Sequence, residues 1–213
     1  MDNNLKMIGK AQAMKVQKSL IARQFDCQIV EDEKEACAAV KRLIPANSSV
    51  ALGGSMTLEE IGMLDELKKM PIQLQDRYAP DLSKQQRDEI LRQAFTSDVY
   101  LMGTNAITLN GELLNVDGTG NRVAALCFGP KKVVIVVGMN KLVLDEEAGW
   151  SRIRRIAAPA NCVRLNKKTP CASVGYCQNC ASDQRICNQF VKIERCRYKD
   201  RISVIIVLKD LGY

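Results

Sequence analysis

Thr104 to Arg122 read TNAITLNGELLNVDGTGNR, and this stretch says most about the fold. Two short apolar segments, 106–109 and 112–116, are separated by the pair Asn110-Gly111. Asn-Gly tolerates the positive φ angles of a two-residue hairpin turn well, so the two segments are predicted to pair as neighbouring strands. The residues after the hairpin would then be presented at the end of a strand.

The loop after the hairpin combines charged side chains with glycines. Asp117, Asn121 and Arg122 lie among two glycines, just before the apolar run 123–128, which is predicted to be a strand. Charge and bare backbone amides at a strand end are typical of a ligand site. The same residues also suit an ordinary turn, since Asp-Gly and Gly-Asn are common turn pairs. Residue types alone leave both interpretations open.

Helices and strands alternate on both sides of this stretch. Strands are predicted at 27–30, 49–52, 72–75, 98–103, 132–138 and 202–208, and helices at 3–25, 32–43, 57–69, 83–95 and 145–157. Thr57 and Glu60 have the spacing of a capping box at the start of the third helix. This alternation predicts an α/β fold in which helices flank a mostly parallel sheet, within a single domain spanning 1–213.

A second glycine-rich loop, Gly53-Gly54-Ser55-Met56-Thr57, joins a predicted strand to a predicted helix. Its glycines permit close approach of the backbone, and the free amides at the start of the helix favour an anion. The same segment also suits a simple helix cap. Neither the dinucleotide-binding glycine pattern nor a phosphate loop is complete, so neither NAD nor flavin is indicated. In open sheets, ligands bind beyond the carboxyl ends of the strands, where this loop and the one from Gly103 are expected.

The composition excludes several classes of protein. The chain has 213 residues, 46% of them apolar, and its longest apolar run, 133–139, is far shorter than the roughly 20 residues that span a bilayer. We therefore expect a cytoplasmic protein without a membrane partner. Histidine is absent, which excludes Ser-His-Asp and Cys-His catalysis. The nine cysteines, with no secretory signal, are expected to be reduced thiols or metal ligands.

Four of the cysteines form a block outside the α/β alternation. Cys171, Cys177, Cys180 and Cys187 lie within 17 residues, and Cys177-x-x-Cys180 can hold one ion from a single turn. Four thiolates suit zinc or an iron-sulfur cluster, but the spacing matches neither a common ferredoxin pattern nor a regular zinc ribbon. The alternative is free thiols, including a redox pair at Cys177 and Cys180.

The positive charge is concentrated around this block. Residues 151–201 contain 12 Lys or Arg and 3 Asp or Glu, a net charge of +9, whereas the rest of the chain has a net charge of −2. We call residues 162–200 the Cys-rich segment and expect it to be inserted before the last strand. Its charge favours a protein partner or an anionic substrate, whereas few aromatic side chains are available to stack nucleic-acid bases.

These motifs together resemble the lactate-utilisation (LUD) domain family. The resemblance rests on 103–122, on Phe128-Gly-Pro through Gly138, on the cysteine block and on Leu211-Gly-Tyr213. It implies the architecture of the NagB/RpiA/CoA-transferase superfamily and, by similarity to some members, a subunit of an iron-sulfur L-lactate oxidation system that works with partner proteins. The block of four cysteines is absent from some members of the family.

The resemblance also implies a site. An anion-binding loop would fall on Gly53, Gly54, Ser55 and Thr57, and a second ligand loop on Gly103, Thr104 and Asn105, with Asp117, Asn121 and Arg122 closing the pocket. Glu112 is the nearest carboxylate to the position of a transferase glutamate, and Asp117 is a second candidate.

Two functions therefore remain open. In the first, the pocket binds a small hydroxy or keto acid through Arg122, and a cluster on the four cysteines relays electrons to a redox partner protein bound at the basic segment. In the second, a non-redox ligand-binding or transferase-like protein holds an anionic metabolite, and the cysteines hold a structural zinc.

Overall fold

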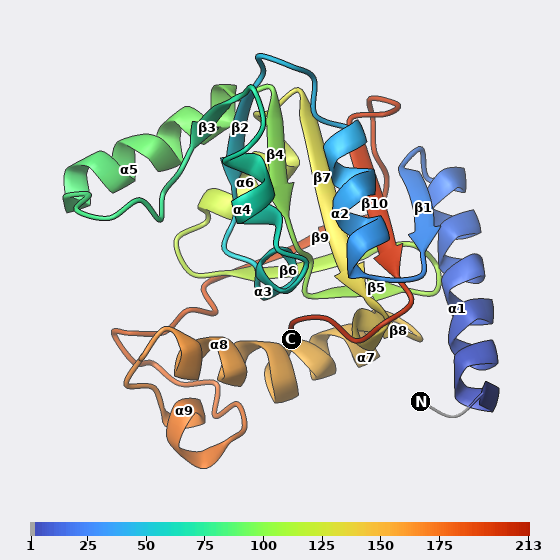
Figure 1. The fold of residues 1–213 in the computed structure, drawn as a ribbon. Coiled ribbons are helices and arrows are strands. Elements are labelled where there is room, and N and C mark those ends of the chain that lie inside the picture. The colour runs from blue at the N-terminus through green and yellow to red at the C-terminus, as the bar shows by residue number, and fades with distance from the viewer. Residues whose placement is uncertain (1–2) are drawn as a thin grey trace.

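A computed structural model describes residues 3–213 and shows an α/β protein built on a parallel sheet of six strands (Figure 1). All the strand pairs in this main sheet are parallel. In order across the sheet, the strands are β1 (Asp26–Val30), β10 (Ile202–Val207), β7 (Lys132–Gly138), β4 (Val99–Met102), β2 (Ser49–Leu52) and β3 (Gln73–Gln75). The predicted α/β class with a mostly parallel sheet is confirmed.

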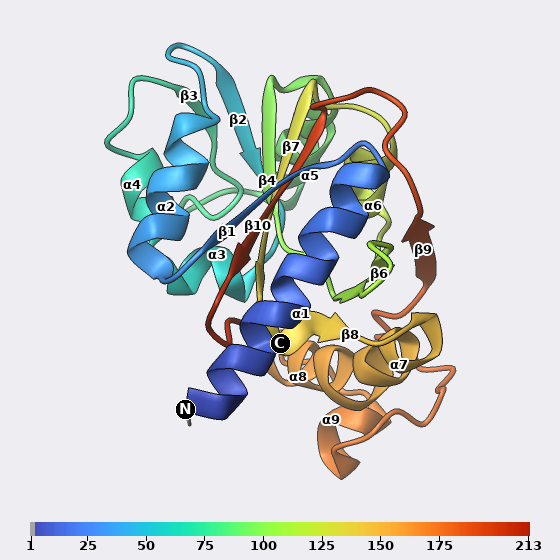
Figure 2. The same cartoon turned by 90° about the vertical axis from the view of Figure 1, so that its right-hand side faces the viewer.

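Helices cover both faces of the main sheet, as Figure 2 shows. The helix α1 (Asn3–Ala22) and α6 (Asn121–Cys127) cover one face, while α2 (Glu33–Arg42), α3 (Met56–Glu60) and α4 (Met63–Leu67) cover the other. Side chains of β7 alternate between the two faces: Val133, Ile135 and Val137 pack toward α1, and Val134 and Val136 toward α2. A strand that is apolar on both sides is what a parallel sheet covered by helices requires.

A smaller mixed sheet lies beside the main sheet, and helices pack against it. Its strands pair in the order β8 (Leu142–Val143), β5 (Ala106–Thr108), β6 (Leu113–Asp117) and β9 (Gln189–Ile193). The helix α7 (Glu146–Arg152) packs on it through Trp150 and continues into a π-helical turn, η3 (Ile153–Ala157), which packs on it through Ile153 and leads into α8 (Ala158–Arg164). The remaining elements are α5 (Lys84–Gln93), η1 (Ala94–Thr96), η2 (Met139–Lys141) and α9 (Pro170–Val174).

The hairpin predicted around Asn110-Gly111 is confirmed, but its turn is different. Ala106 pairs with Leu114 and Ile107 with Leu113 in antiparallel register. Gly111 alone has a positive φ, +85°, and its N–H donates to the Thr108 carbonyl, so Leu109, Asn110 and Gly111 together form the turn. This is the longer type of hairpin loop, in which glycine takes the left-handed position.

Two other predictions about local structure are wrong. The run 123–128 is not a strand but most of α6, whose first amides, Arg122 N and Val123 N, donate to one carboxylate oxygen of Asp117 at 3.0 and 3.1 Å. The predicted helix 57–69 is two helices, because Gly62 takes a left-handed conformation with φ +67°. Ser55, and not Thr57, caps the first of them.

No helix within residues 3–213 is both long enough and apolar enough to cross a membrane.

Candidate functional site

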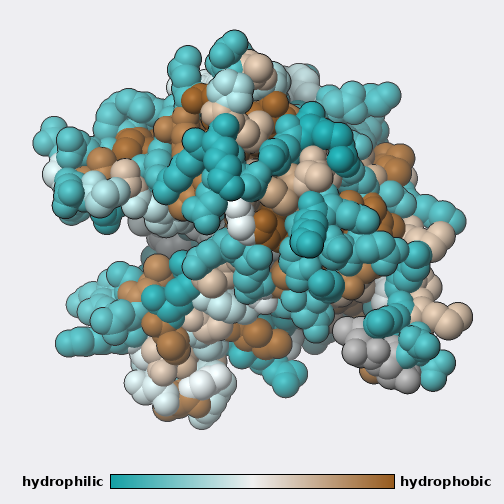
Figure 3. All heavy atoms as spheres, in the orientation of Figure 1, coloured by the Kyte–Doolittle hydropathy of each residue, from teal (hydrophilic) through white to brown (hydrophobic). Residues whose placement is uncertain are grey.

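A cleft of about 600 Å³ opens at the carboxyl ends of the main-sheet strands. It lies between the loops that follow β2 and β4, the start of α6, and the helix α8, where Figure 3 shows the molecule hollowed on one side. The volume is in the range of pockets that enclose a small organic ligand. The position is the one where open parallel sheets bind ligands.

The structure brings together most of the residues that the sequence suggested for a ligand site. The cleft is lined by Gly54, Ser55, Gly103, Thr104, Asn105, Asp117, Asn121 and Arg122. Gly53 and Thr57 lie behind this wall and do not line it. Glu112 does not line it either: its carboxylate accepts from Thr108 Oγ1 at 2.5 Å and lies 3.7 Å from Arg23.

Arg122 is built into the floor of the cleft. Its two terminal nitrogens donate to Gly103 O, Asn105 Oδ1, Asn115 Oδ1 and Val116 O at 2.6 to 3.2 Å. These four bonds join the end of β4 to the end of β6, and only Nε, 3.9 Å from Asp117 Oδ2, is left without a hydrogen bond. Burial lowers the pKa of the guanidinium, while Asp117 opposes that shift. The network makes Arg122 a positioning residue whose donors are already in use.

Lys141, at the end of η2, is a functional candidate that the sequence reading missed. It follows β7 directly, lines the cleft and is only 3% exposed. Its Nζ donates to Thr57 Oγ1 at 2.8 Å, and within the described part of the chain no carboxylate forms an ion pair with it. Burial, and secondly the Arg152 cation, lower its pKa to about 7. One feature of the sequence could have identified Lys141 as a candidate: it lies just beyond the carboxyl end of the most apolar strand.

Positive side chains outnumber carboxylates around the cleft. The cations that line it are Arg77, Arg122, Lys141, Arg164, Lys167 and Arg185, and the carboxylates are Asp117 and Asp183. Asp117 is already committed to the N-terminus of α6 and to Arg122. The field inside the cleft therefore favours a negatively charged ligand.

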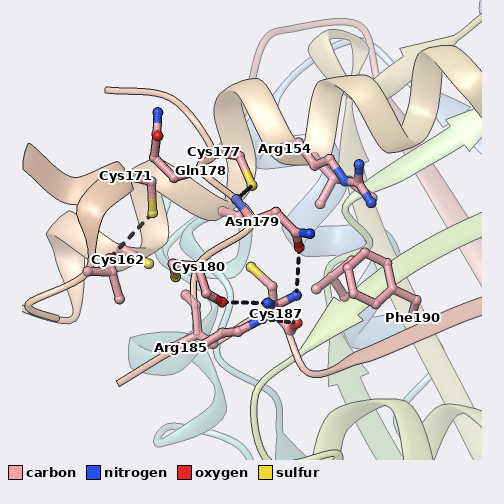
Figure 4. Close-up of a pocket in the computed structure, with 15 residues that line it drawn as sticks. Arg154, Cys162, Cys171, Cys177, Gln178, Asn179, Cys180, Arg185, Cys187 and Phe190 are labelled. Carbon is pink, nitrogen blue, oxygen red and sulfur yellow. Dashed lines mark hydrogen bonds between the residues drawn. The ribbon is translucent and has the colours of Figure 1, made fainter. Parts of the chain in front are cut away.

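A second, much smaller cavity of about 20 Å³ adjoins the cleft and is surrounded by thiols. Figure 4 shows the predicted residues Cys171, Cys177, Cys180 and Cys187 around it, together with Cys162 at the end of α8. Cys187 lines both the cavity and the cleft. Burial, followed by the neighbouring thiols Cys162, Cys177 and Cys171, raises the pKa of Cys187 to about 11.

Arg185 organises the loop that carries these cysteines. Its guanidinium donates to the carbonyls of Cys180 and Cys187 at 2.5 and 2.8 Å, while Asn179 N donates to Cys177 Sγ at 3.4 Å. Among residues 3–213, no three Cys, Asp or Glu side chains already stand in a metal-binding arrangement. The thiols thus share one cavity but are not closed around a single point.

The sheet order and the cleft at its carboxyl edge define an α/β protein with a parallel main sheet that is covered by helices on both faces. Within that class, the chain belongs to the LUD domain family, whose profile matches residues 13–207. The family resemblance seen in the sequence is confirmed.

Solved structures with the same architecture include a DUF162 family protein from Deinococcus radiodurans, at 14% identity and a TM-score of 0.52, covering 93% of this chain and 98% of that one. Ribose 5-phosphate isomerase A from Neisseria gonorrhoeae aligns at 16% identity over 53% of each chain with a TM-score of 0.35. Ribose 5-phosphate isomerase from Plasmodium falciparum aligns at 19% identity over 53% of this chain and 52% of that one, with a TM-score of 0.33. No curated protein is significantly similar to the chain.

Proposed function

We propose that this LUD-domain protein binds a small anionic metabolite in the cleft at the carboxyl edge of its main sheet. The observation that carries the proposal is the excess of cations over free carboxylates around that cleft. The volume of about 600 Å³ exceeds the needs of a three-carbon acid alone, which favours a larger or more highly charged anion. Ser55 and the loop from Gly103 to Asn105 supply further polar contacts.

The test compares two arginines, both exposed, inside and outside the cleft. Arg164 lines the cleft, whereas Arg197 lies over Tyr198 outside it. With pyruvate, L-lactate, phosphate and pyrophosphate as calorimetric probes, Arg164→Gln should weaken binding about tenfold, the equivalent of one charge-assisted hydrogen bond. Arg197→Gln should leave the affinity unchanged. Equal effects of both variants, or no binding of any probe, would remove the proposed function.

A second candidate is the redox role, a subunit of L-lactate (hydroxy-acid) utilisation that passes electrons to a partner protein. It is favoured by the contact between the thiol cavity and the cleft through Cys187, and by the exposed basic residues of the Cys-rich segment. The donor set of Cys171, Cys177, Cys180 and Cys187, with Cys162 nearby, suits an iron-sulfur cluster or zinc. A cluster would supply one-electron transfer, and zinc would supply a crosslink.

The size of the thiol cavity favours the non-redox alternative. Its volume of about 20 Å³ is that of roughly one water molecule, which suits a single ion better than a multi-iron cluster. Iron, sulfide and zinc per chain, measured after purification without oxygen, separate the two candidates. Cys177→Ser should lose the metal, while Cys127→Ser, a change at an exposed thiol outside the cavity, should keep it. Iron with sulfide would support the redox role, and zinc the non-redox one.

A further inference from the structure

Lys141 stands out among the cations of the cleft because it is buried and, within residues 3–213, forms no ion pair with a carboxylate. Its neighbour at hydrogen-bond distance is the hydroxyl of Thr57, which lies 3.3 Å from the Leu211 carbonyl. The other cleft lysine, Lys167, is partly exposed in the loop that follows α8. An ammonium without a carboxylate partner is costly to bury, so this position is unusual unless the amine has a use.

The surroundings of Lys141 favour its neutral form. Arg152 from α7 and Arg122 from α6 both disfavour an added positive charge, and Glu60 from α3 opposes them. Burial combined with a neighbouring cation is the environment that activates lysine as a nucleophile, because the amine keeps its lone pair near neutral pH. Arg152 cannot move away easily, since it donates to the carbonyls of Asn140 and Asn105 at 2.7 and 2.8 Å.

We propose that Lys141 is a nucleophilic amine that forms an imine with the carbonyl group of an anionic keto acid or aldehyde held in the cleft. The nitrogen adds to the carbonyl carbon, and the carbonyl oxygen leaves as water with the two amine hydrogens. A C=N bond replaces the C=O bond, and no oxidant or reductant is consumed. The Thr57 hydroxyl, 2.8 Å from Nζ, lies close enough to relay a proton during this exchange.

This inference rests on the proposed function, because the cations of the cleft must first hold the acid group. It also gives that function a substrate class, namely anions that carry an aldehyde or ketone. L-Lactate, a hydroxy acid without a carbonyl other than its carboxylate, should bind without forming an adduct.

The test is reductive trapping. The purified chain is treated with pyruvate or glyoxylate and cyanoborohydride, and the modified lysines are mapped by mass spectrometry. Lys141 should be modified first and saturably, Lys141→Met should lose that adduct, and Lys199→Met, at an exposed lysine outside the cleft, should retain it. Modification of the natural chain that is spread evenly over surface lysines, without preference for Lys141, would by itself overturn the inference.

Calorimetry without the reductant separates the two proposals. Binding of pyruvate without an adduct at Lys141 would overturn the imine and leave the anion site standing. Absence of binding by any of the anionic probes would remove both.

Discussion

The main sheet and the Cys-rich segment are stabilised in different ways. Strand β7 is buried along nearly its whole length, and apolar side chains cover both of its faces. In contrast, the middle part of the Cys-rich segment, residues 166–188, contains only two buried side chains, Thr169 and Cys171, and its one helix, α9, has five residues. Burial of apolar surface is enough to hold the sheet, whereas the segment depends on polar contacts such as those of Arg185. A segment without a core of its own is where a metal crosslink contributes most.

The largest effect is expected from Arg122→Ala, which would break the floor of the cleft, where the end of β4 meets the end of β6. The change leaves the acceptors of Gly103, Asn105, Asn115 and Val116 without their donor and Asp117 without its cation. We expect the free energy of unfolding in urea to fall by about 4 kcal/mol. Arg164→Ala, at an exposed position, serves as the control and should change it by less than about 0.5 kcal/mol. A loss below about 1 kcal/mol for Arg122→Ala would show that the network is dispensable.

The next largest effect comes from truncating one apolar side chain in each region, the main sheet and the Cys-rich segment, and comparing the losses in the free energy of unfolding. Leu101 in β4 is fully buried, and Leu101→Ala should lower the free energy of unfolding by about 3 kcal/mol. Val174 in α9 is 52% exposed, and Val174→Ala should change it by less than about 0.5 kcal/mol. Similar losses for both variants, measured by urea unfolding, would mean that the Cys-rich segment has a core after all.

A smaller effect is expected from pH, through Lys141. Because its pKa is lowered to about 7 in the folded protein, the unfolded chain binds more protons between about pH 7 and the ordinary lysine value. The free energy of unfolding should therefore rise with pH from 7 to 8, by at most about 1.4 kcal/mol per unit. Buried thiols and Tyr100, whose pKa values are raised, oppose this trend at higher pH.

Lys141→Met isolates this contribution. The variant should be more stable than the natural chain at pH 7, since it no longer buries an amine. Its free energy of unfolding should also change less between pH 7 and 8. Parallel pH profiles for the two proteins would contradict the lowered pKa of Lys141.

The smallest effect on global stability is expected from removing the metal that is proposed for the four cysteines. Chelation, or Cys177→Ser, should abolish hydrogen-exchange protection within 166–188 and lower the global free energy of unfolding by less than about 1 kcal/mol. Amides of β4 and β7 should keep their protection. Loss of protection in those strands would show that the two regions are stabilised as one unit.

The sequence predicted the main sheet well because apolar runs in a covered parallel sheet are nearly continuous. It failed at 123–128, because a short apolar run fits a buried strand and a buried helix equally well. The contact that favours the helix is made by Asp117. Its carboxylate accepts hydrogen bonds from the backbone amides five and six residues later in the chain. Val123-Ala-Ala-Leu, which contains good helix formers, was the signal that favoured a helix.

For the site, the sequence identified the loops but not the role of each side chain. Asp117, Asn121 and Arg122 do line the cleft, yet the donors of Arg122 are saturated by backbone and amide oxygens that no local pattern reveals. Lys141 and Cys162 were missed for the same reason. The burial of the first and the proximity of the second to the thiol block depend on how distant segments pack.

The place of β10 in the main sheet has a consequence for synthesis on the ribosome. This strand lies between β1 and β7, and Asp26 pairs with Ser203, 177 positions later in the chain. At ordinary translation rates, β1 waits roughly 9 to 35 s before β10 emerges to join it, and the exposed edge of β7, which is made much later than β1, waits roughly 3 to 14 s. During that interval the nascent chain presents two unpaired strand edges, so it is a natural client for chaperones that shield such edges.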